Sequence, residues 1–239
     1  MGASGGVTRS TLRQQITDAL RDEVLAGRLR PRVEFTVKQI AEQYGVSATP
    51  VREALFDLSA QGLLESDQHR GFRVREFTVA DYRSMVEART LVIDGVFRGI
   101  VDGAGSASEL LATHRAAMVS VRRRGEEAAR AARGGDLDIL IGYDLRFWRE
   151  LGVIAGNTYV TDFLHRLRVQ AWVFAVPYLR GDADVREWLW NRHQDLVEAI
   201  TAADGTAVRA VLDDYHRHGL NWADRLAAGN PPHPGHGDG

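Results

Sequence analysis

The feature that most constrains the fold is a pair of short helical segments on either side of a single glycine. Residues 36–44 have the pattern of a short helix that starts at Thr36 and is broken by Gly45. A second helix starts after Ser47 and extends to about Gln61, and hydroxyl residues such as these two favour the N-cap position. Two short helices joined by a tight glycine turn predict a helix-turn-helix.

The segments on either side extend this motif into a small domain. Apolar residues at helical spacing predict a helix from about residue 11 to residue 26, where Gly27 ends it. Residues 63–65 and 72–75 have strand character and flank a turn, so they predict a two-stranded wing. We therefore expect a winged helix-turn-helix of three helices plus a small β-hairpin over residues 8–76.

The remainder of the chain is helical in pattern almost to its end, so the fold class is mainly α. The pattern is interrupted at residues 103–106, 134–135, 156–157, 177–182 and 203–205. These breaks predict an antiparallel all-α bundle of about six helices over residues 78–228. The tail, residues 229–239, is rich in Gly and Pro, and we expect it to be disordered because it has little apolar surface to bury.

Composition limits the class of protein. A chain of 239 residues exceeds the usual size of one domain, so two domains are expected. The absence of cysteine excludes disulfides and thiolate metal sites. No segment approaches the roughly 18 apolar residues of a membrane helix, and the first seven residues do not resemble a signal peptide. A soluble cytoplasmic protein without a membrane partner is expected.

Net charge alone argues weakly against a nucleic-acid partner. The formal net charge is −2, whereas proteins that bind DNA usually carry a basic patch. Residues 1–77 contain 11 Lys and Arg against 10 Asp and Glu, so the slight basic excess lies in the N-terminal part of the chain. This distribution supports DNA binding only faintly.

The start of the second helix of the pair has chemistry that suits DNA. Ser47, Thr49 and Arg52 fall on its early turns, where a recognition helix presents its N-terminus to the major groove. Hydroxyls suit phosphates and a guanidinium suits guanine O6 and N7. The opposite face is apolar and consists of Val51, Ala54, Leu55 and Leu58. On spacing alone, ordinary caps and surface residues explain the polar positions equally well.

Residues 27–74 resemble the DNA-binding domain of the GntR family of bacterial regulators. The resemblance rests on the short helix, on Gly45-Val46-Ser47, on the Thr-Pro-Val-Arg-Glu-Ala-Leu run over residues 49–55, and on the Gly-Leu-Leu wing start at residues 62–64. It implies DNA contacts by Lys38, Ser47, Thr49, Arg52, His69, Arg70 and Gly71. Two positions depart from the family pattern, with Ala48 in place of a usual arginine and Arg32 in place of a usual glycine. These departures leave the operator sequence open.

The second half resembles the all-helical effector domain of the FadR-type regulators of this family, called the FCD domain. The matching residues are 87–89, Asp94, Asp144, Phe147, Leu151, 155–157, His193, 199–200 and Asp204. The resemblance implies a homodimer that contacts a palindromic double-stranded operator, and a small-molecule effector that controls DNA binding through the connector at residues 76–78. Repression relieved by ligand is the common family behaviour. The effector, the target genes and the sign of regulation stay open.

Several polar side chains fall where helical spacing expects apolar ones. These are Arg89, Asp144, His193 and Tyr215, each with apolar residues three and four positions away. Singly, each is explained as a core residue with its own partner. Because a buried charge is costly unless paired, four such groups from separate helices indicate either an internal network or a ligand pocket, and we favour the pocket.

A metal site of the kind found in many FCD relatives is incomplete here. The relatives use an Asp-x-x-x-His pair and a histidine on each of two later helices. Asp144 and His193 match, but Trp148 stands at the second position and Tyr215 stands where the last histidine is expected. His216 lies one residue further, which turns it about 100° around the helix. We therefore predict no tightly bound metal and no other cofactor; if an ion is bound, its ligands are Asp144, His193 and His216.

Without a metal, Arg89 becomes the expected anchor of an anionic effector, such as a carboxylate or an acyl metabolite. Trp148 and Tyr215 are then expected to occupy the ion's place and shape an apolar pocket. The remaining aromatic candidates for its lining are Trp172, Phe174, Trp188 and Trp190. For His216 and His218 we expect a solvated face of the last helix.

An enzyme is the alternative from another class. In that interpretation Asp144, His193 and Arg89 are catalytic groups and the winged helix is a targeting module. No nucleophile and base pair and no phosphate loop is visible in the sequence, so we predict that the protein is not an enzyme and has no catalytic residues.

Overall fold

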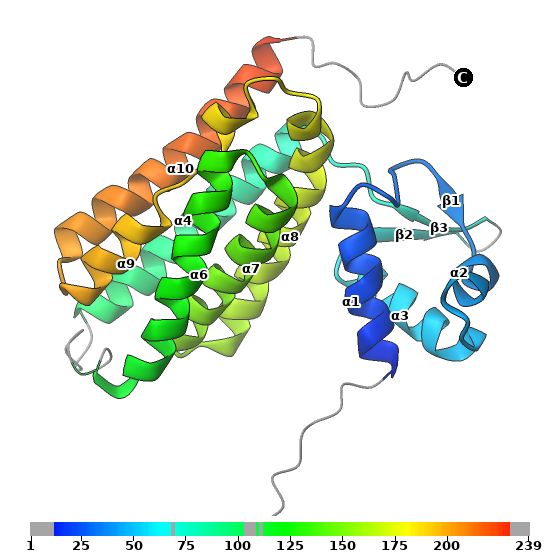
Figure 1. Cartoon of the computed structure of the whole chain (residues 1–239), viewed down its shortest axis with the longest axis horizontal. Helices are drawn as coiled ribbons and strands as arrows, with labels where there is room; N and C mark the ends of the chain where they lie inside the picture. The colour runs from blue at the N-terminus through cyan, green and yellow to red at the C-terminus, as the bar shows by residue number, and fades with distance from the viewer. Residues whose placement is uncertain (1–11, 68–69, 103–108, 110–111, 230–239) are drawn as a thin grey trace, which may run out of the picture. The chain divides into compact units, whose positions relative to one another are not determined.

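The computed structural model describes residues 12–67, 70–102, 109 and 112–229 (Figure 1). It divides the chain into two compact units, one up to Glu76 and one from Phe77. Each unit is considered by itself below.

The first unit contains three helices and a small sheet. The elements are α1 (Leu12–Leu25), β1 (Glu34–Phe35), α2 (Val37–Tyr44), α3 (Ala48–Ala60), β2 (Leu64–Asp67) and β3 (Gly71–Val74). Helices α1 and α2 both pack against α3. The face of α3 that meets them consists of four side chains with no exposed surface, Val51, Ala54, Leu55 and Leu58. This order of elements confirms the predicted winged helix-turn-helix.

The turn between α2 and α3 is fixed by local chemistry. Thr36 caps α2 by accepting a hydrogen bond from the Gln39 backbone N–H at 3.2 Å, and the Gln39 side chain accepts one from the Thr36 N–H at 2.8 Å. This reciprocal capping box satisfies two backbone donors that a helix start leaves unpaired. Gly45 ends α2 with φ at +64°, a conformation that glycine adopts without steric cost.

The wing has one strand more than the sequence predicts. The sheet order is β1-β3-β2, and both pairings are antiparallel. Strand β3 pairs Gly71 with Asp67 of β2 and Phe72 with Phe35 of β1. The predicted hairpin is present as β2 and β3, and β1 adds a third strand that the sequence does not predict, because two residues are too few to show the alternating pattern of a strand. The pairing of β1 is set by tertiary contact.

Arg32 explains one departure from the family pattern. Its φ is +68°, in the left-handed region that favours glycine. A non-glycine residue there carries a cost of about 1 kcal/mol. Its guanidinium donates two hydrogen bonds to the Glu76 carboxylate, at 2.7 and 2.9 Å. At this position the chain therefore has a backbone conformation that glycine adopts without steric cost, although the residue is an arginine.

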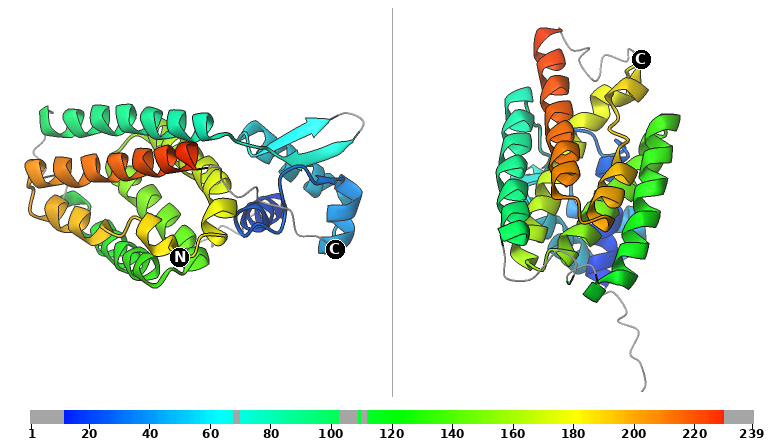
Figure 2. Two further views of the ribbon diagram at one scale, coloured as in Figure 1. Left: turned by 90° about the horizontal axis from the view of Figure 1, so that it is seen from above. Right: turned by 90° about the vertical axis from the view of Figure 1, so that its left-hand side faces the viewer.

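The second unit is a bundle in which, over the part of the chain that the structure describes, six α-helices surround a shared interior. They are α4 (Val79–Asp102), α6 (Arg115–Gly134), α7 (Leu137–Ile154), α8 (Thr158–Arg180), α9 (His193–Thr201) and α10 (Gly205–Ala228), with a short 3₁₀ helix, η1, at Val185–Trp188. Neighbours pack in the order α6, α7, α8, α4, α10, α9 and back to α6, which closes a ring. Both views in Figure 2 show α4 beside α10. The predicted bundle is confirmed.

One predicted helix break is wrong, and two other predicted segments lie outside the described residues. Helix α8 continues through Pro177 to Arg180, whereas the sequence predicts a break there. Proline removes one backbone donor and crowds the preceding turn, and so close to the C-terminus of a long packed helix that loss is tolerated. The predicted break at residues 103–106 and most of the predicted tail, residues 230–239, lie outside the described residues.

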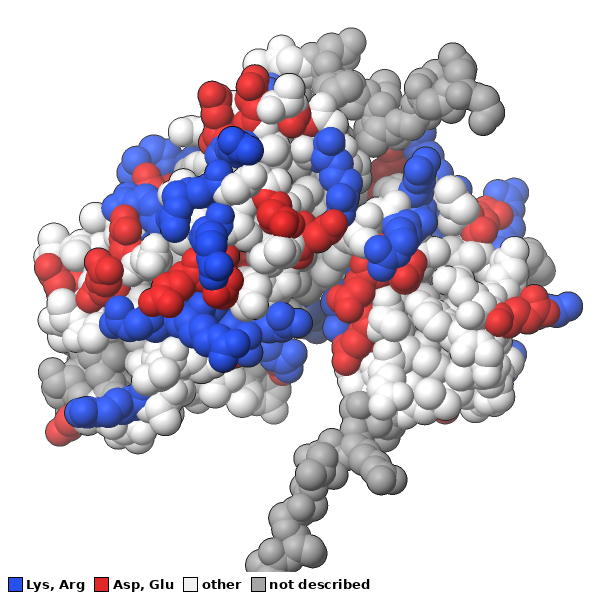
Figure 3. Space-filling view, viewed as in Figure 1, with Lys and Arg blue, Asp and Glu red and all other residues white. Residues whose placement is uncertain are grey.

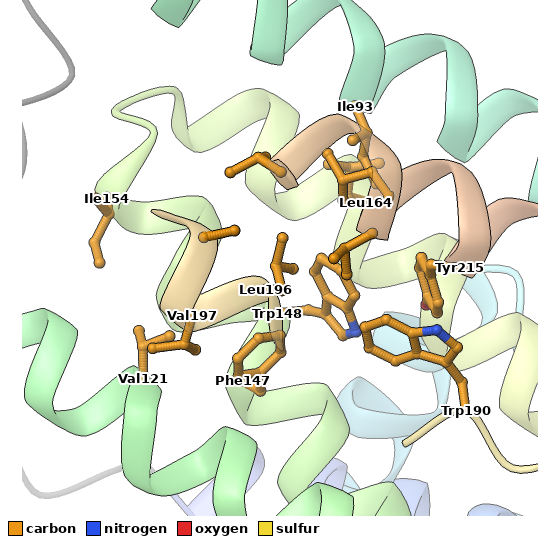
Figure 4. Packing of buried hydrophobic residues seen from close by; sticks show 14 of the residues in the cluster. Ile93, Val121, Phe147, Trp148, Ile154, Leu164, Trp190, Leu196, Val197 and Tyr215 are labelled. Carbon is orange, nitrogen blue, oxygen red and sulfur yellow. The ribbon is translucent and has the colours of Figure 1, made fainter. Parts of the chain in front are cut away.

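The bundle core combines aromatic and aliphatic side chains. In Figure 4, Trp190 and Tyr215 lie on one side of Trp148, while Ile154 and Val197 lie on the other. Phe147 has no exposed surface. No described helix is both long enough and apolar enough to cross a membrane.

Gly71 gives a test of the wing. Its φ is +100°, and a Cβ atom added there would lie 2.5 Å from the backbone oxygen of Phe35. Gly71→Ala is expected to lower the free energy of opening the wing by about 2 to 3 kcal/mol, because a backbone clash adds to the strain of positive φ. Hydrogen exchange of the amides in residues 62–76, followed by mass spectrometry, measures this directly.

Gly45→Ala is the matched control for that experiment. Gly45 also has positive φ, but no atom lies within 4 Å of the added Cβ. This variant should lower the free energy of unfolding by only about 1 kcal/mol, which is the strain of the left-handed conformation. Equal exchange in the two variants would contradict the close approach of β1 to Gly71.

Candidate functional site

The candidate DNA-binding surface lies on α2, α3 and the wing. Lys38, Ser47, Thr49 and Arg52 are all exposed, whereas the apolar face of α3 is fully buried. Among the described residues, no carboxylate forms an ion pair with Arg52. The guanidinium is therefore available to a partner outside this chain.

Ser47 differs in one detail from the expectation. It occupies the N-cap position of α3 with extended backbone, but its side chain makes no capping hydrogen bond. The first turn of α3 thus presents backbone N–H groups together with an uncommitted hydroxyl, a combination that suits a phosphate.

The other predicted contacts are placed as follows. Lys38 lies 3.8 Å from Glu42, and Arg70 lies 3.8 Å from Glu34; these exposed ion pairs are weak and exchange readily. Gly71 begins β3. His69 lies outside the described residues.

Charge of one sign does not dominate the face of the molecule in Figure 3. Lys and Arg are interspersed with Asp and Glu over the bundle. The assignment of DNA contacts therefore rests on the local chemistry of the winged helix.

In the second unit, Asp144 is the centre of a buried hydrogen-bond network. Its Oδ1 accepts a hydrogen bond from Trp148 Nε1 at 3.0 Å and lies 3.0 Å from His193 Nε2. Its Oδ2 accepts one from Trp172 Nε1 at 2.9 Å. Because a carboxylate only accepts, His193 must carry its proton on Nε2. One side chain of α7 thus joins α8 and the start of α9.

The network keeps the Asp144 carboxylate ionised. Burial raises the pKa of Asp144, but hydrogen bonds from His193 and Trp172 and the charge of Arg168 lower it by more, so the pKa lies below its ordinary value. Asp144 is 5% exposed and therefore carries its negative charge inside the bundle.

Arg89 is buried in the same region, as its spacing indicates. It is 6% exposed, and its Nη1 donates a hydrogen bond to the Tyr215 hydroxyl at 2.8 Å. Its Cζ also lies 4.1 Å from the centroid of the Tyr215 ring, a cation–π distance. Its Nε has no hydrogen-bond partner among the described residues.

Arg168 is a second buried arginine, which the sequence interpretation missed. It is 4% exposed, and its Cζ lies 4.3 Å from the centroid of the Trp148 ring. Burial, assisted by repulsion from Arg89, lowers the pKa of Arg168 from its ordinary value. Its Nε also has no partner among the described residues. Leu164 and Trp172, four residues to either side, are the helical signal that would have identified it.

His216 lies inside the bundle, so the expectation of a solvated face is wrong for it. It is 5% exposed because α10 packs against both α4 and α9 and buries a wide face. Burial and the charges of Arg89 and Arg168 lower its pKa to about 4, which keeps the ring neutral near pH 7. Neither ring nitrogen has a partner among the described residues. His218 is half-buried, and its Nε2 lies 2.9 Å from the Trp188 carbonyl oxygen.

Several of these groups, but not His216, line a cavity of about 80 Å³. The lining includes Arg89, Asp144, Arg168 and Tyr215 from four different helices, together with Trp172, Trp188 and Trp190. Phe174 is not part of the lining; its ring stacks on Tyr82, with ring centroids 5.1 Å apart. His193 and Trp148, which the sequence places in the effector site, are not among the lining residues; both contact Asp144 Oδ1.

The donor set does not fit a divalent cation. Both oxygens of Asp144 face N–H donors, and two guanidinium groups lie in the same cavity, so the surroundings repel positive charge. Trp148 and Tyr215 stack with ring centroids 4.8 Å apart. Within the described residues, no group of three or more His, Cys, Asp or Glu side chains is arranged to hold an ion.

Comparison with protein families gives two matches along the chain. The family described as "Bacterial regulatory proteins, gntR family" matches residues 12–74. The family described as "FCD domain" matches residues 104–218.

Individual relatives match over most of their length. A protein of Paenarthrobacter nicotinovorans named "Probable D-xylose utilization operon transcriptional repressor" is 30% identical over 200 residues, which cover 83% of this chain and 82% of that one. The "HTH-type transcriptional repressor RspR" of Escherichia coli K12 is 25% identical over 203 residues, 84% of each chain. The solved structure "E. coli McbR/YncC" has the same fold, with a TM-score of 0.70 and 21% identity over 92% of this chain and 100% of that one.

The absence of a bound metal stays a prediction, and elemental analysis tests it. Protein purified without chelators is expected to contain much less than one equivalent of zinc, nickel or manganese, and EDTA is expected to leave its melting temperature unchanged. Near-stoichiometric metal would contradict this, and Asp144→Asn and His216→Gln would then show whether these residues hold the ion.

Proposed function

The chain belongs to the GntR family of bacterial regulatory proteins and carries an FCD domain, and on this basis we propose that it is a repressor controlled by a small anionic effector. It is a DNA-binding transcriptional regulator. The proposal adds that the protein acts in the cytoplasm as a homodimer on a palindromic operator. The curated relatives reported above are transcriptional repressors, which agrees with the interpretation that the protein is not an enzyme.

The proposed operator contacts are supported by the exposed residues of the winged helix. Ser47 and Thr49 present hydroxyls to phosphates, and Arg52 presents its guanidinium to a guanine base edge. Lys38, Arg70, Gly71 and, outside the described residues, His69 add contacts to the backbone. A homodimer places two such helices one turn of DNA apart, which accounts for a palindromic site.

The observation that carries the effector proposal is an excess of buried positive charge. Two arginines, Arg89 and Arg168, and one carboxylate, Asp144, are the buried Arg, Lys, Asp and Glu side chains of the described part of the bundle. An unbalanced charge in a protein interior is costly. Both guanidinium Nε–H groups lack an acceptor within the described residues. A carboxylate bound between them would balance the charge and accept these hydrogen bonds.

The remaining polar residues then have assigned roles in the proposed site. Tyr215 holds Arg89 in place through its hydroxyl. Asp144 is held in place by Trp148 and His193, and it supplies the negative charge in the lining of the cavity. Because these groups come from α4, α7, α8 and α10, a bound anion would draw helices of the bundle together. An effector alters DNA affinity only through its different affinity for the two arrangements of the dimer, and the connector at residues 76–78 carries that difference.

Arg52→Ala tests the recognition helix. Loss of a base-contacting guanidinium is expected to weaken binding to the protein's own upstream intergenic DNA by at least tenfold. Binding is measured by gel shift at fixed salt against a scrambled duplex. Arg133→Ala, an exposed position at the end of α6, removes the same charge and should leave specific affinity unchanged. Unchanged affinity in Arg52→Ala would remove this residue from the operator contacts.

Arg89→Met tests the effector site. The variant keeps the length of the side chain but removes its charge, so it should bind operator DNA normally and respond to carboxylates at no less than tenfold higher concentration. The readout is the gel shift in the presence of acetate, succinate, citrate and octanoate. Arg98→Met, exposed on the same helix, is the control. An unaltered response in Arg89→Met would show that the anion binds elsewhere.

A further inference from the structure

A second cavity in the bundle, of about 360 Å³, has no role in the function proposed so far. Its lining comes from α4, α7, α8, α9 and α10, and it includes Val96, Leu151, Leu164 and Val208. Apart from Asn157, Thr161 and Arg168, every lining residue is apolar. An apolar void of this size forfeits packing contacts along its wall, which a hydrocarbon would restore.

The polar groups of this cavity are already engaged, except for one. Asn157 Oδ1 accepts a hydrogen bond from the Val160 N–H at 3.2 Å, and Thr161 Oγ1 donates one to the Asn157 carbonyl oxygen at 2.9 Å. These bonds cap the start of α8. Arg168 is the exception, because its buried Nε has no partner among the described residues. A sugar or other polyol would leave most of its hydroxyls unpaired in such a lining.

Arg168 lies at the boundary of the two cavities. It lines the smaller polar cavity with Arg89 and Asp144, and it lines the larger apolar one with Trp148. Its guanidinium packs over the Trp148 ring, which forms part of the apolar wall. A cation in the wall of an otherwise apolar cavity is an arrangement that can receive an anionic head with a hydrocarbon attached.

We infer that the effector is an amphipathic monocarboxylate, with its carboxylate on Arg168 and its hydrocarbon in the larger cavity. The inference rests on the proposed function, since it names the chemical class of that anion. A cavity of 150 Å³ holds benzene. The larger cavity, at about 360 Å³, therefore has room for a hydrocarbon of about 12 carbon atoms at most. Small polyacids lack the hydrocarbon, and fatty alcohols lack the charge.

The test is a titration of the full-length protein with a homologous series of probes at pH 7.5. The probes are acetate, butanoate, hexanoate and octanoate, with octanol as the uncharged analogue and succinate as the polyacid. All five tryptophans of the chain lie in the second unit, so their fluorescence reports binding there. Each added CH₂ should tighten Kd about three- to fourfold. Octanol should bind at least tenfold more weakly than octanoate.

Two variants separate the hydrocarbon from the charge. Val96→Trp fills part of the larger cavity without touching the polar one, and it should weaken octanoate at least tenfold while leaving acetate unchanged. Leu91→Trp, 73% exposed on the same helix, is the control and should change neither. Leu151→Trp fills the same cavity from α7 if Val96→Trp does not fold. Arg168→Met should abolish the preference for octanoate over octanol.

The possible outcomes separate the amphipathic monocarboxylate from the anionic effector of the proposed function. Binding of succinate with no gain along the monocarboxylate series would overturn the inference and leave an anionic effector standing. Equal affinity for octanoate and octanol would overturn the role of Arg168. If no carboxylate of any length binds, the anionic effector itself is wrong. Tight octanoate binding that Val96→Trp removes and Leu91→Trp keeps would establish the two-part site.

Discussion

The second unit depends on the Asp144 carboxylate and the three N–H groups that face it. Trp148, Trp172 and His193 come from different parts of the chain, and each must be oriented toward the same two oxygens. Few arrangements of α7, α8 and α9 satisfy all three at once, so this network specifies the bundle interior more strictly than apolar packing alone. It also engages both oxygens of the carboxylate, and Arg89 and Arg168 are left without a buried carboxylate of their own.

Local signals in the sequence predicted much of this molecule. Thr36, Gly45 and the apolar face of α3 specify the helix-turn-helix because capping, positive φ and helical spacing act over a few residues. Features that depend on contacts between distant parts of the chain could not be predicted from the sequence. Strand β1 is formed by pairing with β3, and α8 continues through Pro177, which lies close to the C-terminus of a long packed helix.

The candidate site shows the same division. Spacing placed Arg89 and Asp144 inside the bundle, but it placed His216 outside, because the width of the buried face of α10 depends on two neighbours rather than one. Arg168 was missed because Arg166, two residues earlier, makes the segment resemble a solvated face. Tyr215 and His216 are neighbours on α10 and therefore point about 100° apart around its axis. Tyr215 lines the smaller cavity, whereas His216, the residue that could have replaced the missing metal ligand, does not.

The unbalanced guanidinium pair has a consequence for the lifetime of the protein. A group that binds only the folded chain raises its free energy of unfolding by mass action. If the proposed anion binds there, the unliganded regulator, with two buried cations against one carboxylate, would be the less stable form, and cellular proteases would degrade it sooner. A metabolite that fills the site would then control how much of the regulator accumulates. It would also control how tightly the regulator binds DNA, so one molecule would respond to the metabolite concentration in two ways.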